Sequence, residues 1–158
     1  MERHQLILTE DSLRVPERFT VTAWSDPLVE RLGYRLDSPY FFRWWAPTLG
    51  PTATLLAFNL AAAIEDVPLG ESVEVVARDL ARMVGVGANM DLMSRHNPFT
   101  RGLARLVRFE TGRVPAAGDR LEIRRRVPML NARQLGHLPA SLQERHAAET
   151  VADGHRAA

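Results

Sequence analysis

The chain has 158 residues, of which 46% are hydrophobic and 25% are charged, a composition typical of one soluble globular domain with a buried core. It has no cysteine, which excludes disulfide frameworks and thiolate metal sites. The N-terminus lacks the apolar stretch of a secretory signal, and the longest apolar run is shorter than the roughly 20 residues that a membrane span needs, so we expect a cytoplasmic protein with no membrane partner.

Positive charge is concentrated in one part of the chain, although the formal net charge is only +1. Residues 95–133 contain ten arginines against three acidic residues, a net charge of +7, so the remainder sums to −6. Such an asymmetry indicates an anionic partner for one face of the protein. The alternative is a solvated basic face in a chain that uses arginine at all 20 of its Lys and Arg positions.

The N-terminal part predicts only short elements. Residues 6–8 and 19–22 are predicted to form short strands. A short helix follows, because Asp26 can cap it, Pro27 suits its first turn and Gly33 can end it.

An aromatic cluster follows at residues 40–45. Aromatic side chains bury large areas, so packing in the core is the first interpretation. The second is a dimer interface formed by Tyr40, Phe41, Trp44 and Trp45. Base stacking by exposed rings is a third.

Two helices are predicted in the middle of the chain. Residues 52–65 are apolar on nearly all sides, which predicts a central buried helix. Residues 71–75 form a short strand or the start of a second helix, which is predicted over residues 76–84. Gly85 can supply the left-handed residue that ends this helix, and a loop follows at residues 86–97.

An amphipathic arginine helix is predicted at residues 98–110, with Asn97 as its cap. Its apolar face consists of Phe99, Leu103, Leu106 and Val107. Its opposite face consists of Arg101, Arg105 and Arg108.

A hairpin is predicted after this helix, with a turn at residues 111–119 and a strand over residues 120–127. The positions predicted to face outward are Glu122, Arg124 and Arg126, and those predicted to face inward are Leu121, Ile123 and Val127. Arg125 breaks this alternation, which places it at the end of the strand or at a twist.

The C-terminal part predicts two more helices. Asn131 can cap a short helix that runs to Leu138, and Pro139 can open another that runs to Ala148. Residues 150–158 are small and polar, so we expect this end to fray.

The stretch Leu80-Ala81-Arg82-Met83-Val84-Gly85-Val86 resembles the pattern that closes the first helix of a helix-turn-helix. From about residue 51 to residue 127 the chain therefore resembles the winged helix-turn-helix domains of bacterial regulators. The expected fold is mainly α with a small β-hairpin wing. We expect an N-terminal extension at residues 1–46, the winged helix-turn-helix at residues 47–128, and C-terminal helices with a tail at residues 129–158.

The resemblance also implies where DNA would lie, since such domains place the second helix of the motif in the major groove and the wing against the flanking backbone. The implied contacts are Thr100, Arg101, Arg105, Arg108, Arg113, Arg120, Arg124 and Arg126. Arginine binds both phosphate and guanine. A face lined only by arginine, preceded by a loop longer than the usual turn, suits backbone contact better than sequence readout.

We therefore expect a cofactor-free DNA-binding protein, a transcriptional regulator or a DNA-organising factor, that forms a homodimer through the aromatic cluster, the C-terminal helices or both. The alternative is a winged-helix module that mediates protein–protein interaction in a larger assembly, which the long loop and the terminal additions favour. An enzyme is not expected. The five histidines lack the spacing of a zinc hydrolase, and the chain has neither a phosphate-binding glycine loop nor a nucleophilic serine motif.

Overall fold

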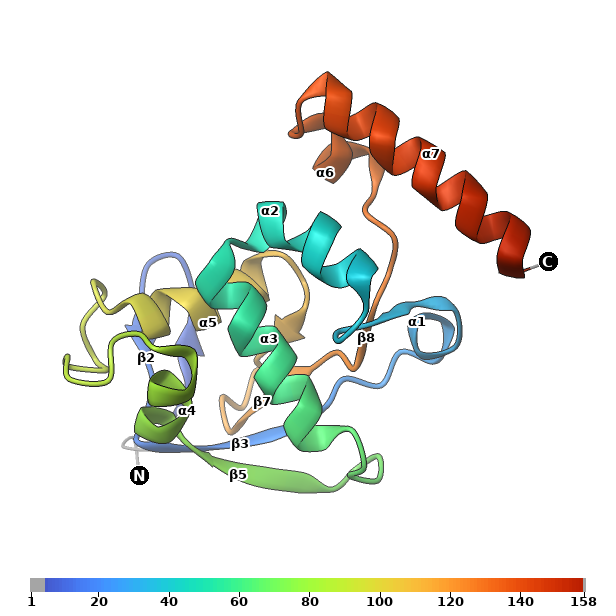
Figure 1. Ribbon diagram of the computed structural model, residues 1–158. Coiled ribbons are helices and arrows are strands. Elements are labelled where there is room, and N and C mark those ends of the chain that lie inside the picture. The colour runs from blue at the N-terminus through green and yellow to red at the C-terminus, as the bar shows by residue number, and fades with distance from the viewer. Residues whose placement is uncertain (1–4, 158) are drawn as a thin grey trace.

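The computed structural model describes residues 5–157, with side chains as far as Ala152. Over these residues the fold is mixed α/β, with seven α-helices, one π-helix and eight short strands in three sheets (Figure 1). The predicted helices are present, and so are the predicted strands near residues 6–8 and 19–22. The further strands make the fold mixed α/β, whereas a mainly α fold with one β-hairpin was expected.

The largest sheet has four strands in the order β5–β3–β7–β6. β3 (Arg18–Ala23) pairs antiparallel with β5 (Ser72–Val76) and parallel with β7 (Arg120–Ile123), and β7 pairs antiparallel with β6 (Gly112–Arg113). β3 comes from the predicted N-terminal extension and lies between strands of the predicted winged-helix unit. The two predicted units therefore share one sheet.

Two smaller sheets flank this one. β1 (Ile7–Leu8) pairs with β2 (Leu13–Arg14), and β4 (Tyr34–Arg35) pairs with β8 (Arg126–Val127). The prediction of one strand over residues 120–127 is therefore wrong, because β7 and β8 belong to different sheets. The chain leaves the large sheet where three consecutive arginines replace the alternation of polar and apolar residues.

The three helices predicted around the core are confirmed. α3 (Pro51–Ile64) is the central helix and packs against both α4 (Ala77–Val84) and α5 (Pro98–Arg108). α4 ends at Gly85, whose φ of 77° is left-handed as predicted. α5 begins after Asn97, whose side chain accepts hydrogen bonds from two backbone N–H groups of the first turn.

The short N-terminal helix is also confirmed. α1 (Pro27–Leu32) starts after Asp26, whose carboxylate accepts from the Val29 N–H. No helix among residues 5–157 is both long and apolar enough to cross a membrane.

The aromatic cluster lies in the core, on the π-helix η2 (Phe41–Trp45) that leads into α2 (Ala46–Leu49). Tyr40, Phe41, Trp44 and Trp45 are all buried by their own chain. The Trp45 indole N–H donates to the carbonyl of Pro128 at 3.0 Å. Packing in the core is therefore confirmed for these side chains, and the prediction that they form a dimer interface is wrong.

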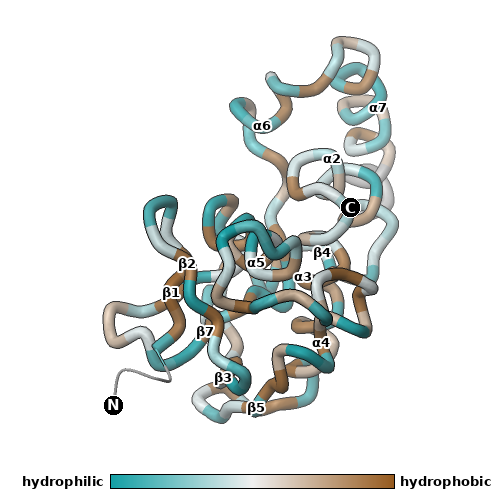
Figure 2. Tube along the Cα trace, turned by 90° about the vertical axis from the view of Figure 1, so that its left-hand side faces the viewer, coloured by the Kyte–Doolittle hydropathy of each residue, from teal (hydrophilic) through white to brown (hydrophobic). Residues whose placement is uncertain are grey.

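The C-terminal helices rise from one end of the body (Figures 1 and 2). α6 (Ala132–Gly136) starts with the predicted Asn131 cap, which forms a reciprocal capping box with Gln134. α7 (Ala140–Ala157) runs past the predicted end at Ala148 and through most of the segment that was predicted to fray.

Buried Tyr40 attaches these C-terminal helices to the body. Its hydroxyl oxygen accepts from the Leu130 N–H at 2.9 Å and lies 2.8 Å from Nε2 of His146 on α7. The hydroxyl can donate its proton to Nε2 when that nitrogen carries no proton. The carboxylate of Glu149 on α7 accepts a hydrogen bond from the Trp44 indole N–H and forms an ion pair with Arg43 of η2.

The contact between α3 and α5 depends on Gly102. A Cβ at this position would lie 2.7 Å from Cδ1 of Leu56 and 3.0 Å from Cγ2 of Thr52. We expect Gly102→Val to lower the free energy of unfolding by about 2 kcal/mol, since overpacking forces the two helices apart. Urea unfolding followed by circular dichroism measures this. Gly136→Ala is the control, because nothing lies within 4 Å of a Cβ there. Equal stability of the two variants would contradict the prediction.

Acid should weaken the attachment of α7. Burial lowers the pKa of His146 below its ordinary value of 6.5, although Glu149 opposes this shift. The stabilisation by His146 is therefore fully present above pH 6.5 and is lost as the pH falls through the lower pKa of the folded state. Urea unfolding between about pH 8 and about pH 5 should show this loss in the natural chain.

Two variants distinguish the contribution of His146 to this pH dependence from that of the other titrating groups. His146→Phe should remove the loss of stability over this pH range, because it leaves no titratable ring at this position. His96→Gln is the control, since His96 is exposed in the loop before α5. An unchanged pH dependence in His146→Phe would contradict the assignment.

Candidate nucleic-acid interface

Helix α5 separates its apolar and basic side chains as the sequence predicted. Phe99, Leu103 and Leu106 are fully buried against the core. Arg101, Arg105 and Arg108 are exposed. Their spacing of four and then three residues places them in one stripe along the helix.

These three arginines have no acidic partner within the described part of the chain, and the same holds for Arg133 on α6. Arg105 donates hydrogen bonds to the carbonyls of Leu49 and Thr48, both at 2.7 Å, at the end of α2. Carbonyl oxygens orient the guanidinium group without cancelling its charge. The stripe therefore keeps its full positive charge.

The basic stripe continues from α5 to α6 along two grooves. One groove is lined by Arg101 and Arg105 together with the start of α3. The other, of about 540 Å³, is lined by Arg108, Arg133 and Thr48 among others. Since Thr48 accepts from Arg105, the two grooves meet at this hydrogen bond. Arg133 was not among the predicted contacts, although it belongs to the basic segment of the sequence.

Thr100 was predicted to face DNA, and this prediction is wrong. Its side chain is fully buried, and its hydroxyl donates to the carbonyl of Leu92 at 2.8 Å. The preceding loop folds back over this position. Buried Asn97 holds that loop, because its amide donates to the carbonyls of Gly87 and Asp91. The length of the loop is thus accommodated by local packing.

The arginines of the β6–β7 hairpin are paired with acids. Arg113 and Arg120 both bind the carboxylate of Glu122, and Arg120 also binds Asp119. Glu122 was predicted to face outward, but it is only 8% exposed. The carboxylates of Glu122 and Asp119 neutralise much of the positive charge that was predicted for a wing.

Arg124 is committed to an interaction within the protein. It pairs with Asp26 at 2.8 Å and donates to the carbonyl of Glu110 at 2.7 Å. Its guanidinium carbon lies 3.8 Å from the centroid of the Trp24 ring, while that of Arg113 lies 4.4 Å from it. The hydrogen bond from Arg124 holds the pKa of Asp26 below its ordinary value of 3.8.

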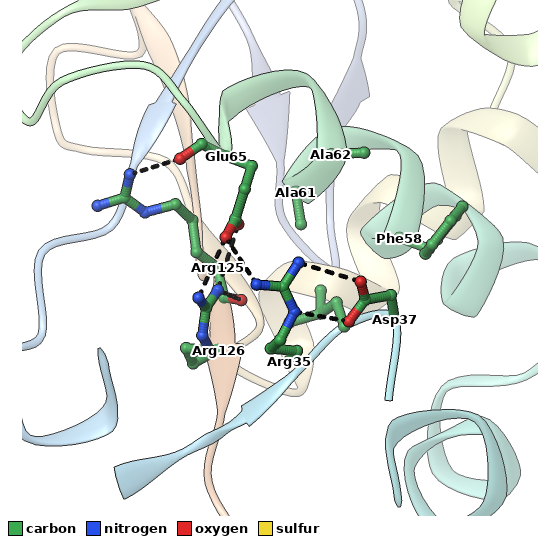
Figure 3. A pocket seen from close by; sticks show the side chains of 9 residues that line it. Arg35, Asp37, Phe58, Ala61, Ala62, Glu65, Arg125 and Arg126 are labelled. Atoms are coloured by element: carbon green, nitrogen blue, oxygen red, sulfur yellow. Dashed lines mark hydrogen bonds and ion pairs between the residues drawn. The ribbon is translucent and has the colours of Figure 1, made fainter. Parts of the chain in front are cut away.

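Arg125 and Arg126 belong to an ion-pair network with Glu65 at the end of α3 (Figure 3). Arg126 donates to both carboxylate oxygens of Glu65, at 3.2 and 3.1 Å, and Arg35 adds a third contact at 3.3 Å. Arg125 reaches the Glu65 carbonyl and pairs with Glu30 of α1. Arg125 and Arg126, like Arg124 before them, are only partly exposed.

The structure therefore divides the predicted contacts into two groups. Arg101, Arg105 and Arg108 lie together on an exposed face, where Arg133 joins them. Those that pair with carboxylates elsewhere are Arg113, Arg120, Arg124 and Arg126. No signal in the basic segment itself marks Arg124 and Arg126 as paired, because their carboxylates, Asp26 and Glu65, come from distant segments.

Among the described residues, no three His, Asp or Glu side chains gather where they could hold a metal ion. Comparisons with protein-family models, with curated proteins and with solved structures found no match.

The ion-pair network around Glu65 should make the free energy of unfolding fall at acidic pH. The hydrogen bond from Arg126 holds the pKa of Glu65 below its ordinary value of 4.5. The stabilisation is therefore present above pH 4.5 and is lost as the pH falls through the lower pKa of the folded state. At neutral pH, Glu65→Gln should lower the free energy of unfolding by about 1 kcal/mol, since charge-assisted hydrogen bonds are lost.

The difference between Glu65→Gln and the natural chain should shrink as the pH falls below 4.5 and disappear below the lowered pKa of Glu65 in the folded state, where both chains are neutral at this position. Urea unfolding at several pH values measures it. Glu71→Gln removes the same charge from an exposed position and is the control. A difference that persists in acid would show that the network does not act through the carboxylate charge.

Proposed function

We propose that this protein binds duplex DNA through the arginine stripe of α5, with Arg133 of α6 extending the contact. The observation that carries this proposal is the set of exposed guanidinium groups on one surface without acidic partners in the described chain. Neutralising phosphates with such groups releases counterions, which favours binding to a polyanion. The stripe offers arginine alone, which suits the phosphate backbone.

The order of elements supports the proposal as well. A helix, a strand, two helices and a hairpin follow one another as α3, β5, α4, α5, β6 and β7, in keeping with the resemblance to winged helix-turn-helix domains. Two features depart from it: β3 separates β5 from β7, and the hairpin arginines are internally paired. The proposed contact therefore uses the helix and assigns no contact to the wing.

The internally paired hairpin also favours a second candidate, a module that binds an acidic protein surface. The resemblance implies two DNA contacts, the helix and the wing. Because the hairpin arginines are neutralised by acids of the same chain, the wing contact is weakened. Both candidates use the same arginine stripe. They differ in whether the partner is DNA or an acidic protein. Measuring the affinity for defined DNA duplexes distinguishes the two. Dimerisation through the C-terminal helices, without the aromatic cluster, stays a prediction.

The test is the affinity for a short duplex of random sequence as a function of salt. We expect Arg101→Ala and Arg108→Ala each to weaken binding about 5-fold, equivalent to about 1 kcal/mol for a lost charge-assisted hydrogen bond. Each should lower the slope of log affinity against log salt by about one unit. Fluorescence anisotropy of a labelled duplex measures both quantities.

Arg31→Ala is the matched control. Arg31 is exposed in the last turn of α1, which lies on the opposite side of the body from α5 in Figure 1, and its loss changes the net charge equally. Equal weakening by all three substitutions would mean that net charge alone determines binding. Salt-independent binding, or no binding at low salt, would exclude the proposal and leave the acidic protein partner as the better candidate.

A further inference from the structure

The groove between α5 and α6 has basic and apolar walls. Its volume of about 540 Å³ lies within the roughly 300–1,000 Å³ range of small-molecule sites. The basic wall consists of Arg108, Arg133 and His137, and the apolar wall includes Phe109 and Leu138. A few convergent polar groups over an apolar surface are the usual composition of a site for a small organic ligand.

The charged hydrogen-bond donors of this groove are the guanidinium groups of Arg108 and Arg133. The side chains of Asn131 and Gln134 also line it; the capping box of α6 uses their side-chain oxygens as acceptors, and their amide N–H groups add neutral donors. Arg108 and Arg133 have no ion pair within residues 5–152. Glu110 is the one carboxylate among the lining residues. The two guanidinium groups therefore outweigh the acid and give the groove a positive charge.

Several contacts hold the groove in shape. Arg105 of α5 donates to the carbonyl of Thr48, which lines one wall of the groove. The guanidinium carbons of Arg105 and Arg108 lie 5.1 and 5.6 Å from the centroid of the Phe109 ring. On the other side, the Leu130 N–H bonds to Tyr40 immediately before α6 begins. A groove whose walls are fixed in advance loses less entropy when it binds a ligand.

We propose that this groove binds a phosphomonoester with a small apolar body. The phosphate lies between Arg108 and Arg133, within reach of His137, and the apolar body lies against Phe109 and Leu138. A phosphomonoester carries close to two negative charges at neutral pH and has three acceptor oxygens. It matches two guanidinium groups better than a carboxylate, which carries a single charge.

Ligand binding also regulates the arginine stripe, because Arg108 belongs to both surfaces. A phosphate held by Arg108 occupies a guanidinium group that DNA would use, so the ligand and DNA compete. This part of the inference rests on the proposed DNA binding. The binding of the ligand itself does not depend on it.

The test is a titration of the full, isotope-labelled chain with phenyl phosphate, followed by NMR. We expect saturable shifts of the backbone amides of Phe109, Arg133 and His137. Arg133→Gln should weaken binding at least about tenfold, since a charge-assisted hydrogen bond is lost. Arg31→Gln is the matched control and should bind as the natural chain does, because Arg31 lies on α1. Absence of saturation, or equal weakening by both variants, overturns the proposal.

Two further ligands test the chemistry. Benzoate has the same ring with a carboxylate, and binding as tight as that of phenyl phosphate overturns the assignment of a phosphomonoester. Inorganic phosphate lacks the ring, so weaker binding of this ion supports the apolar wall, and equal binding overturns the role of that wall.

A competition experiment tests the regulatory part. Phenyl phosphate should displace a labelled duplex from the natural chain at lower concentration than benzoate does at the same ionic strength, and equal displacement by the two would overturn the regulatory part. If the chain binds phenyl phosphate but no DNA, the proposed function fails and the ligand site stands. If it binds DNA but no phenyl phosphate, the ligand site fails alone.

Discussion

Pairing between guanidinium and carboxylate groups determines the organisation of the second half of this chain. A partly buried charge without a partner costs several kcal/mol, so the chain cannot turn after β7 unless Arg124, Arg125 and Arg126 find acids. They find Asp26 and Glu30 at α1 and Glu65 at the end of α3. These pairs connect the turn between two sheets to two helices, and they explain why β8 joins a different sheet from β7.

The same pairing decides which positive charge reaches the surface. The basic segment has a net charge of +7 in sequence, but acids from earlier parts of the chain neutralise Arg124, Arg125 and Arg126 after β7. Helix α5 presents its arginines away from those acids, with neutral carbonyls as the nearest partners of Arg105. The positive surface is therefore smaller than the sequence indicates and lies on one helix and its neighbour. Such a concentrated face is better suited to a polyanion than a charge spread around the molecule.

Features set by neighbouring residues could be predicted, and features set by distant contacts could not. The caps at Asp26, Asn97 and Asn131 and the left-handed Gly85 depend on a few adjacent residues, so their sequence signals were sufficient. The helix over residues 51–64 was evident because it is apolar on nearly every side. In contrast, the central place of β3 depends on parallel pairing with a strand about a hundred residues later, which leaves no local pattern.

In the candidate site, too, local features could be predicted and features set by distant contacts could not. Helical spacing correctly placed Arg101, Arg105 and Arg108 on one exposed face. The same spacing could not show that the loop of residues 86–97 returns to cover Thr100. Nor could it distinguish Arg124 from Arg108, because the carboxylate that pairs with Arg124 lies 98 positions away in the sequence. An arginine is available to a partner only if no acid of its own chain reaches it, and that property belongs to the fold.

Buried Tyr40 influences the positive surface, because it helps to position the helix that carries Arg133. Burial raises the pKa of its hydroxyl to about 12, so it stays protonated and can donate to His146 while accepting from Leu130. Leu130 lies immediately before α6, and His146 lies on α7, so one buried hydroxyl fixes both C-terminal helices. Arg133 lines the same groove as Arg108, and its place there depends on the position of α6. The aromatic cluster, whose sequence favoured either core packing or an interface, therefore shapes the surface indirectly, by holding the helix that completes the arginine stripe.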